Sequence, residues 1–140
     1  HPTPNDFIRC AEKVSGLELE WFLTDWTQTI NTIDYSVKSA VSLEGQTDIT
    51  LERIGLMPMP VEVQVLMKDG GIKNYYIPLQ MMRGEKPLLD SEVLLKDWAW
   101  AYPEYTFSVA MDPSKIDTIT VDINKATADV NKENNQLKVL

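Results

Sequence analysis

PMPVEVQVLMKDGGIKNYYIPL, residues 58–79, is the stretch that decides the fold. Val61, Val63 and Val65 are separated by polar residues, and this period of two is typical of a β-strand with one buried face. Asp-Gly-Gly at 69–71 follows directly, and a tight turn between strands needs the positive φ that glycine supplies. A second apolar run begins straight after the glycines. The stretch therefore predicts a β-hairpin.

The same period recurs on both sides of this hairpin, from residue 33 onward. Further strands are predicted at residues 33–37, 49–51, 94–102, 105–111 and 118–123, with a last short strand at 137–140. About seven or eight short strands joined by turns are typical of two packed antiparallel sheets. We therefore expect a mainly β protein, an antiparallel immunoglobulin-like β-sandwich preceded by two short α-helices.

Helix signals fill the chain before residue 33. Thr3 is a good N-cap, Pro4 suits the first helical position, and Asp6 can reach back to the cap amide. Ser15 and the glycine after it end this helix. Ser15 also offers a cap to the next helix, where Glu18 would complete a second capping box. The first 32 residues are therefore predicted to form two short helices.

The second helix carries a wide apolar stripe that includes two large aromatic rings. Its members recur at helical spacing and are Leu19, Phe22, Leu23, Trp26 and Ile30. Such a stripe is wider than a small free-standing helix needs, so the first four residues are candidates for packing against a neighbouring domain. Without that neighbour, the helices are expected to fold back on the sandwich or to dock on a second chain as a homodimer.

Composition and charge exclude several kinds of partner. The chain has 140 residues, 44% of them hydrophobic, which is enough for one domain with a real core. Its net charge of −8 argues against nucleic acid and against an anionic membrane surface, because both need clustered lysine and arginine. The sequence contains no apolar run as long as the ~18 residues that a membrane span needs. We therefore expect neither nucleic acid nor a membrane as a partner.

The residues of common catalytic and metal sites are scarce. His1 is the one histidine and Cys10 the one cysteine, so the sequence holds no HExxH helix, no cysteine pair for zinc and no Ser-His-Asp set. Cys10 is expected to be a small buried hydrophobe. Asp122, Asn124 and Asp129 could supply three oxygen ligands for calcium, an alternative that the sequence leaves open. We assign no catalytic, metal-binding or substrate-binding residue.

A cluster of aromatic residues near residue 100 has two interpretations. If residues 94–102 form a strand, Trp98, Trp100 and Tyr102 share one face, with small alanines opposite. The face can belong to the core or lie buried against a neighbouring domain. Alternatively, it is an exposed platform on which a free-standing binding module stacks carbohydrate rings or a peptide.

Several motifs along the chain carry a resemblance to a known family. The N-terminal ones are HPTPNDF at 1–7, VSGLELEWF at 14–22 and Trp26, and the later ones are IDY at 33–35, RIGLMPMPV at 53–61, KDG at 68–70 and KDW at 96–98. The first group resembles the end of the catalytic domain in the M1 family of zinc aminopeptidases, with Glu18 in place of the usual aspartate. The second group is similar to the β-sandwich domain that follows it, and the resemblance spans most of residues 1–123.

The resemblance implies a division of the chain. Residues 1–32 would be the helical end of a thermolysin-like catalytic domain, 33–123 an accessory β-sandwich and 124–140 a C-terminal tail. The sandwich would brace the catalytic domain and wall the substrate cleft. The family's HExxH zinc helix, third glutamate ligand, GxMEN motif and catalytic tyrosine all lie upstream of the matched region, so none maps onto a residue of this sequence.

The parent implied by the resemblance removes N-terminal residues from peptides, with a zinc-bound water as nucleophile. Its partners would be the upstream catalytic domain and the peptide substrate. Zinc would belong to the parent and not to this segment, which lacks HExxH and is expected to be inactive alone. The compartment stays open between periplasmic, secreted and cytoplasmic.

Overall fold

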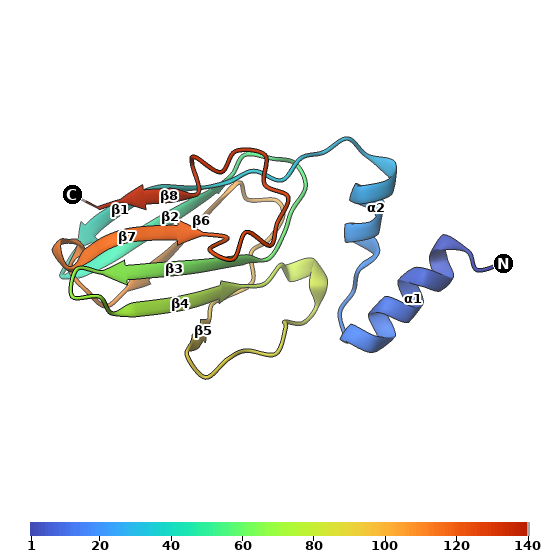
Figure 1. The fold of residues 1–140 in the computed structure, drawn as a ribbon, viewed down its shortest axis with the longest axis horizontal. Helices are drawn as coiled ribbons and strands as arrows, with labels where there is room; N and C mark the ends of the chain where they lie inside the picture. The colour runs from blue at the N-terminus through green and yellow to red at the C-terminus, as the bar shows by residue number, and fades with distance from the viewer. Residues whose placement is uncertain (140) are drawn as a thin grey trace.

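The computed structural model describes residues 1–139, in which two helices precede eight strands (Figure 1). The helices are α1 (Pro4–Ser15) and α2 (Glu20–Gln28), and two short 3-10 helices are η1 (Gln80–Met82) and η2 (Pro113–Lys115). The strands are β1 (Tyr35–Leu43), β2 (Gln46–Arg53), β3 (Val61–Met67), β4 (Ile72–Ile77), β5 (Glu92–Leu94), β6 (Glu104–Val109), β7 (Ile116–Val121) and β8 (Gln136–Lys138). This mainly β architecture with N-terminal helices confirms the predicted class.

The strands form two sheets that pack face to face. One sheet has the order β1-β2-β6 and the other the order β5-β4-β3-β7-β8. This strand order is that of an immunoglobulin-like sandwich. In the smaller sheet, β1, β2 and β6 take the places of strands A, B and E. In the larger sheet, β3, β7 and β8 take the places of strands C, F and G. β5 pairs with β4 in parallel, so the sheet is mixed at this edge where an antiparallel one was predicted. The long connection from β4 to β5 allows the parallel pairing, because it carries the chain back before β5 begins.

The predicted hairpin is the centre of the larger sheet. Val61 of β3 pairs with Ile77 of β4, and Leu66 pairs with Ile72 beside the turn. Gly70 has a φ of 88°, as the tight turn requires, and its N–H donates to the Met67 carbonyl at 2.9 Å. The alternating valines of β3 are all buried between the sheets.

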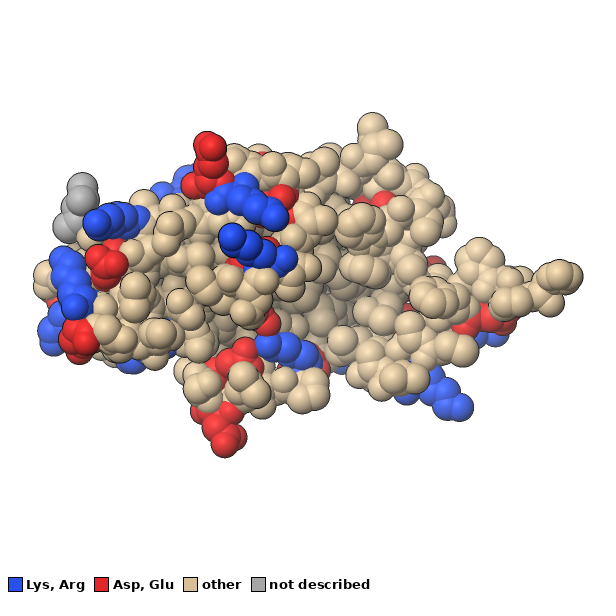
Figure 2. Space-filling model, in the orientation of Figure 1, with Lys and Arg blue, Asp and Glu red and all other residues tan. Residues whose placement is uncertain are grey.

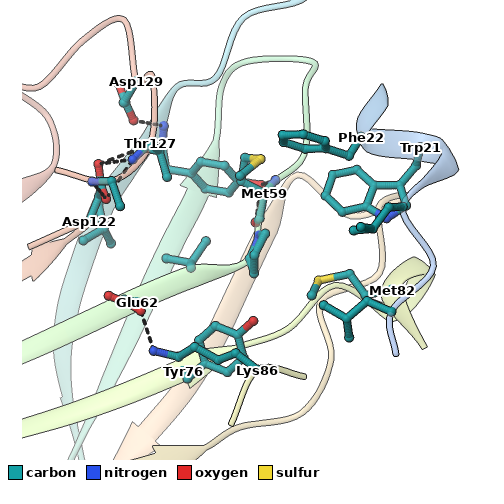
Figure 3. Close-up of a pocket in the computed structure, with 17 residues that line it drawn as sticks. Trp21, Phe22, Met59, Glu62, Tyr76, Met82, Lys86, Asp122, Thr127 and Asp129 are labelled. Atoms are coloured by element: carbon teal, nitrogen blue, oxygen red, sulfur yellow. Dashed lines mark hydrogen bonds and ion pairs between the residues drawn. The ribbon is translucent and has the colours of Figure 1, made fainter. Parts of the chain in front are cut away.

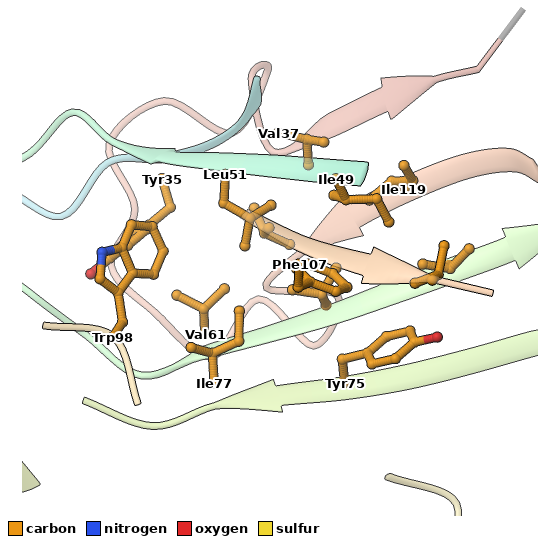
Figure 4. Packing of buried hydrophobic residues seen from close by; sticks show 14 of the residues in the cluster. Tyr35, Val37, Ile49, Leu51, Val61, Tyr75, Ile77, Trp98, Phe107 and Ile119 are labelled. Atoms are coloured by element: carbon orange, nitrogen blue, oxygen red, sulfur yellow. The ribbon is translucent and has the colours of Figure 1, made fainter. Parts of the chain in front are cut away.

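The core between the sheets is closed and apolar (Figure 4). Ile49 and Leu51 of β2 meet the valines of β3 across the sandwich, and neither has any exposed surface. Toward the helical end of the molecule, the rings of Tyr35 and Trp98 meet edge to face, with centroids 5.5 Å apart. Full burial of each large apolar side chain is worth about 1.5–3 kcal/mol, so this core supplies most of the stability of the fold.

The prediction of a strand at residues 94–102 is wrong. β5 ends at Leu94, and Trp98 forms only an isolated bridge to Leu79. The chain then turns, because the Trp98 indole donates to the Tyr102 carbonyl at 2.8 Å while the Tyr102 N–H donates to the Ala99 carbonyl at 3.1 Å. The Trp-Ala alternation therefore reflects a turn that buries one tryptophan, not a strand with an aromatic face.

The segment 124–139 closes the sandwich. β8 pairs with β7, and the N–H of Val37 in β1 donates to the carbonyl of Asn134 at 3.2 Å. The buried carboxylate of Asp129 accepts the N–H of Tyr35 at 2.9 Å. The last residue of the strand expected at 137–140 lies outside the described residues. This segment thus bridges the edges of both sheets.

The start of α1 agrees with the sequence, and the start of α2 does not. Thr3 and Asp6 form the predicted reciprocal capping box. The second capping box is absent: α2 begins at Glu20, after Leu19, without a side-chain cap. Ser15 does accept the N–H of Leu17 at 3.2 Å, but no helix begins there, and the N–H of Leu19 donates to Glu12 of α1 at 2.9 Å. Within residues 1–139, no helix is long and apolar enough to cross a membrane.

Candidate functional site

A cleft of about 390 Å³ lies between α2 and the adjacent end of the sandwich, and we call it the helix–sandwich cleft. In Figure 3, Trp21 and Phe22 of α2 face Met59 across it, while Glu62 and Lys86 lie on the side of the larger sheet. The volume falls in the range of roughly 300–1,000 Å³ that ligand pockets occupy. The walls are mostly apolar, which suits an apolar side chain or a small ligand more than a charged one.

The helical wall of the cleft is attached by the segment that precedes α2. Leu17, Trp21 and Phe22 are half-buried and pack against the core. The N–H of Glu18 donates to the carbonyl of Met82 at 2.9 Å, which joins this segment to η1. The Trp21 indole donates to the Glu18 carbonyl at 2.7 Å and so fixes its ring at the edge of the cleft.

The predicted stripe of α2 is divided between the cleft and solvent. Leu19 and Phe22 line the cleft, and Leu23 is half-buried. Trp26 is 50% exposed and Ile30, which follows the helix, is 99% exposed. The helix therefore folds back on the sandwich with one half of its apolar surface and leaves the other half uncovered.

A cluster of charges forms the sheet side of the cleft. The Lys86 amine donates to Glu62 at 2.6 Å and to Glu92 at 2.8 Å, and it lies 5.0 Å from the centroid of the Tyr76 ring. Partial burial opposes its charge, but the bonds to the two carboxylates outweigh this and raise the pKa of Lys86. The same contact with Lys86, followed by the N–H of Leu89, lowers the pKa of Glu92. This ion cluster holds the loop after η1 against the sheet.

The two aspartates of the cleft are engaged by the protein itself. Asp122 accepts the N–H of Ala126 at 2.9 Å and the hydroxyl of Thr127 at 2.7 Å. Asp129 accepts backbone N–H groups from Tyr35 at 2.9 Å and Asn131 at 2.8 Å. Within residues 1–139, no three His, Cys, Asp or Glu side chains are grouped to hold a metal ion. The carboxylates of the calcium alternative thus fix loops rather than converge on one point.

The aromatic residues predicted to share a face are separated. Trp98 is 2% exposed and lies in the core, as the first interpretation required. Trp100 is 51% exposed and Tyr102 66% exposed, on the turn that follows. The Arg53 guanidinium lies 5.6 Å from the centroid of the Trp100 ring, and it donates to the backbone carbonyl of Trp100 at 3.0 Å. A platform of three rings does not form.

The predicted burial of Cys10 is wrong as well. Its thiol is exposed on α1, because this helix buries none of its residues against the rest of the chain. The apolar period of α1 is real, but within one copy of residues 1–139 the helix leaves it uncovered.

A second groove, of about 450 Å³, lies on the other side of α2, and we call it the α2 groove. It is lined by Leu56, Pro58, Met81 and Trp100, which we call its apolar floor, by Glu18, Glu20 and Asp25, which we call its acidic rim, and by Trp21, Thr24 and Asn31. No periodic pattern marks Leu56 and Met81 as residues of this groove, or Lys86 as a residue of the helix–sandwich cleft. They lie in connections without apolar periodicity, and only the fold brings them to α2.

Comparison with protein-family models gives no match, and comparisons with curated proteins and with solved structures give none either. The role of the site is therefore inferred from its side chains and from the motifs in the sequence.

Proposed function

We propose that this chain is a non-catalytic accessory module that packs against an adjoining domain through its helical end. One observation carries the proposal: large apolar side chains stay exposed around α2 while the sandwich core is closed. They are Trp26, Ile30, Leu56, Trp100 and Tyr102. On the face in Figure 2, most charged side chains lie over the sandwich, and the α2 region presents mainly uncharged residues. Large apolar side chains that stay exposed in one region of a surface are typical of interaction sites.

The resemblance to M1 zinc aminopeptidases names the adjoining domain. In that proposal, α1 and α2 are the last helices of a zinc-dependent catalytic domain, and the sandwich braces it. The helix–sandwich cleft would lie at the junction and wall part of the path that the peptide substrate takes. Zinc would be held by residues upstream, and this chain would contribute no ligand to it.

The test is zinc content and hydrolysis of an aminoacyl nitroanilide. The 140-residue chain is expected to retain no zinc after dialysis and to release no nitroaniline. The natural protein that contains this chain is expected to do both. Stoichiometric zinc and hydrolysis by the 140-residue chain itself would contradict the proposal.

A free-standing binding module is the second candidate, and the exposure of Trp100 and Tyr102 favours it. Two rings on one turn can stack on a sugar or a peptide side chain. Titration with neutral oligosaccharides and short peptides, followed by tryptophan fluorescence, tests this role. Binding that Trp100→Ala removes and Trp26→Ala leaves unchanged would support it; the absence of any saturable response would exclude it.

A further inference from the structure

Helix α1 exposes an apolar stripe with a basic flank. Phe7 is 64% exposed and Val14 90% exposed, and the Cys10 thiol is also exposed. These residues share one side of the helix at spacings of three, four and seven. Arg9 and Lys13 are exposed and four residues apart, so they lie together beside the stripe. Asp6 lies on the same flank, where it bonds to Thr3. The stripe is therefore an apolar band flanked by two cationic side chains and one engaged carboxylate.

The α2 groove has the opposite character. Its floor is apolar, and the charged residues that line it, Glu18, Glu20 and Asp25, are all acidic. Among the described residues, Glu20 takes part in no ion pair, and Glu18 meets only the exposed Arg83 at 3.3 Å. Most of the acidic rim therefore has no cationic partner, and the apolar floor stays uncovered.

We propose that α1 of a second copy of this chain lies in the α2 groove, so that the two copies exchange helices reciprocally. The apolar stripe would cover the floor, and Arg9 and Lys13 would approach the acidic rim. A reciprocal contact of this kind uses the same two surfaces on both copies and closes as a two-fold dimer. α1 is 12 residues long, about 18 Å, and three full turns of it carry the stripe.

This dimer goes beyond the proposed function and does not rest on it. An adjoining domain that covers α1, Leu56 and Trp100 in a longer protein would compete with the second copy for the stripe and for the groove. Within residues 1–139 neither surface is covered, and Arg9 and Lys13 on one are opposite in charge to Glu18, Glu20 and Asp25 on the other. Complementary charge sets the register of such contacts and suppresses wrong partners.

Sedimentation velocity over a series of protein concentrations tests the dimer. The unmodified chain is expected to pass from monomer to dimer as concentration rises. The double variant Arg9→Glu with Lys13→Glu is expected to weaken the dimer about tenfold or more, because like charges would then face each other. The control is Lys68→Glu with Lys73→Glu, the same change in charge near the β3–β4 turn at the far end of the sandwich (Figure 1), and it should leave the dimer intact.

A rescue by mixing separates charge complementarity from damage to the fold. A second double variant, Glu18→Lys with Glu20→Lys, is expected to be monomeric alone. Mixed with the Arg9→Glu, Lys13→Glu variant, it should form a heterodimer, since each helix would again meet a rim of opposite charge. A strictly monomeric unmodified chain, a dimer that the helix charges do not affect, or a mixture that stays monomeric would each overturn the proposal.

Discussion

The hydroxyl group of Tyr35 bonds to both backbone groups of Met59. It accepts the Met59 N–H at 2.8 Å and donates to the Met59 carbonyl at 3.1 Å. Tyr35 begins β1 in the smaller sheet, whereas Met59 leads into β3 of the larger one, so this pair ties the two sheets together beside the helix–sandwich cleft. The Trp98 ring packs on Tyr35 from the core side.

Tyr35→Phe tests how much this tie contributes. The substitution keeps the ring in the core but leaves both backbone groups of Met59 without their partner. We expect the free energy of unfolding to fall by about 1–3 kcal/mol, the cost of unsatisfied, partly buried polar groups. Urea unfolding followed by circular dichroism measures it. An unchanged midpoint and slope would show that the hydroxyl bonds are replaced by water.

The stability of the fold should fall at alkaline pH. Burial raises the pKa of Tyr35 to about 12, against a weaker lowering by the bond to Met59. Because the folded pKa exceeds the unfolded value of 10.0, the stabilisation is fully present below pH 10 and is lost as pH rises from 10 toward 12. Urea midpoints measured across this range should decline.

The variant Tyr35→Phe isolates the contribution of Tyr35 to this decline. Burial also raises the pKa of Tyr75, Tyr76 and Tyr105, so the variant should keep a shallower decline. Equal slopes for the variant and the unmodified chain would mean that Tyr35 does not titrate with unfolding.

Gly55 packs against the backbone that joins α2 to the sandwich. A Cβ atom at Gly55 would lie 2.2 Å from the Thr32 carbonyl oxygen and 2.7 Å from the Asp34 nitrogen, and neither backbone atom can move freely. We expect Gly55→Ala to destabilise the fold by about 1–3 kcal/mol through overpacking. Gly84→Ala is the matched control, because its Cβ would meet the flexible tip of Leu17 at 3.0 Å and would lie in ordinary contact with the Gly16 carbonyl oxygen at 3.7 Å. Thermal unfolding should rank the two; equal midpoints would contradict the close approach at Gly55.

Two tryptophans only two residues apart should behave differently. Removing the buried ring with Trp98→Ala should destabilise the fold by about 3–5 kcal/mol, whereas Trp100→Ala should cost less than about 1 kcal/mol. The emission of Trp100 is the part that Trp100→Ala removes, and the emission of Trp98 is the part that the milder variant Trp98→Phe removes. In the folded protein, acrylamide should quench the Trp100 emission far more than the Trp98 emission. Similar quenching of the two components would contradict the buried position of Trp98.

The sequence pattern predicted correctly the elements that depend on residues close together in the chain. The hairpin of β3 and β4 follows from alternating valines and a glycine turn within one stretch, and the capping box of Thr3 and Asp6 spans only four residues. The error at residues 94–102 has the opposite origin. Alternation there comes from a turn fixed by the Trp98 indole and from tertiary burial of its ring, and neither leaves a distinct period in the sequence.

The cleft could not be predicted for the same reason. It joins Leu17, Tyr35, Met59, Lys86 and Thr127, which come from five separate segments. Sequence periodicity showed that α2 has an apolar stripe, but not which half would meet the sandwich. That division depends on the bond between Glu18 and Met82 and on the shape of the sandwich end, which arise only after the sheets have packed.

We propose that this chain is the non-catalytic end of a zinc aminopeptidase. Determining the coding sequence immediately upstream of His1 tests this proposal. We expect an HExxH motif there, followed by a glutamate at metal-ligand spacing, in the same reading frame as the 140 residues. A start codon directly before His1, or an unrelated domain in that place, would contradict the claim and favour a binding sandwich that uses the exposed Trp100 and Tyr102.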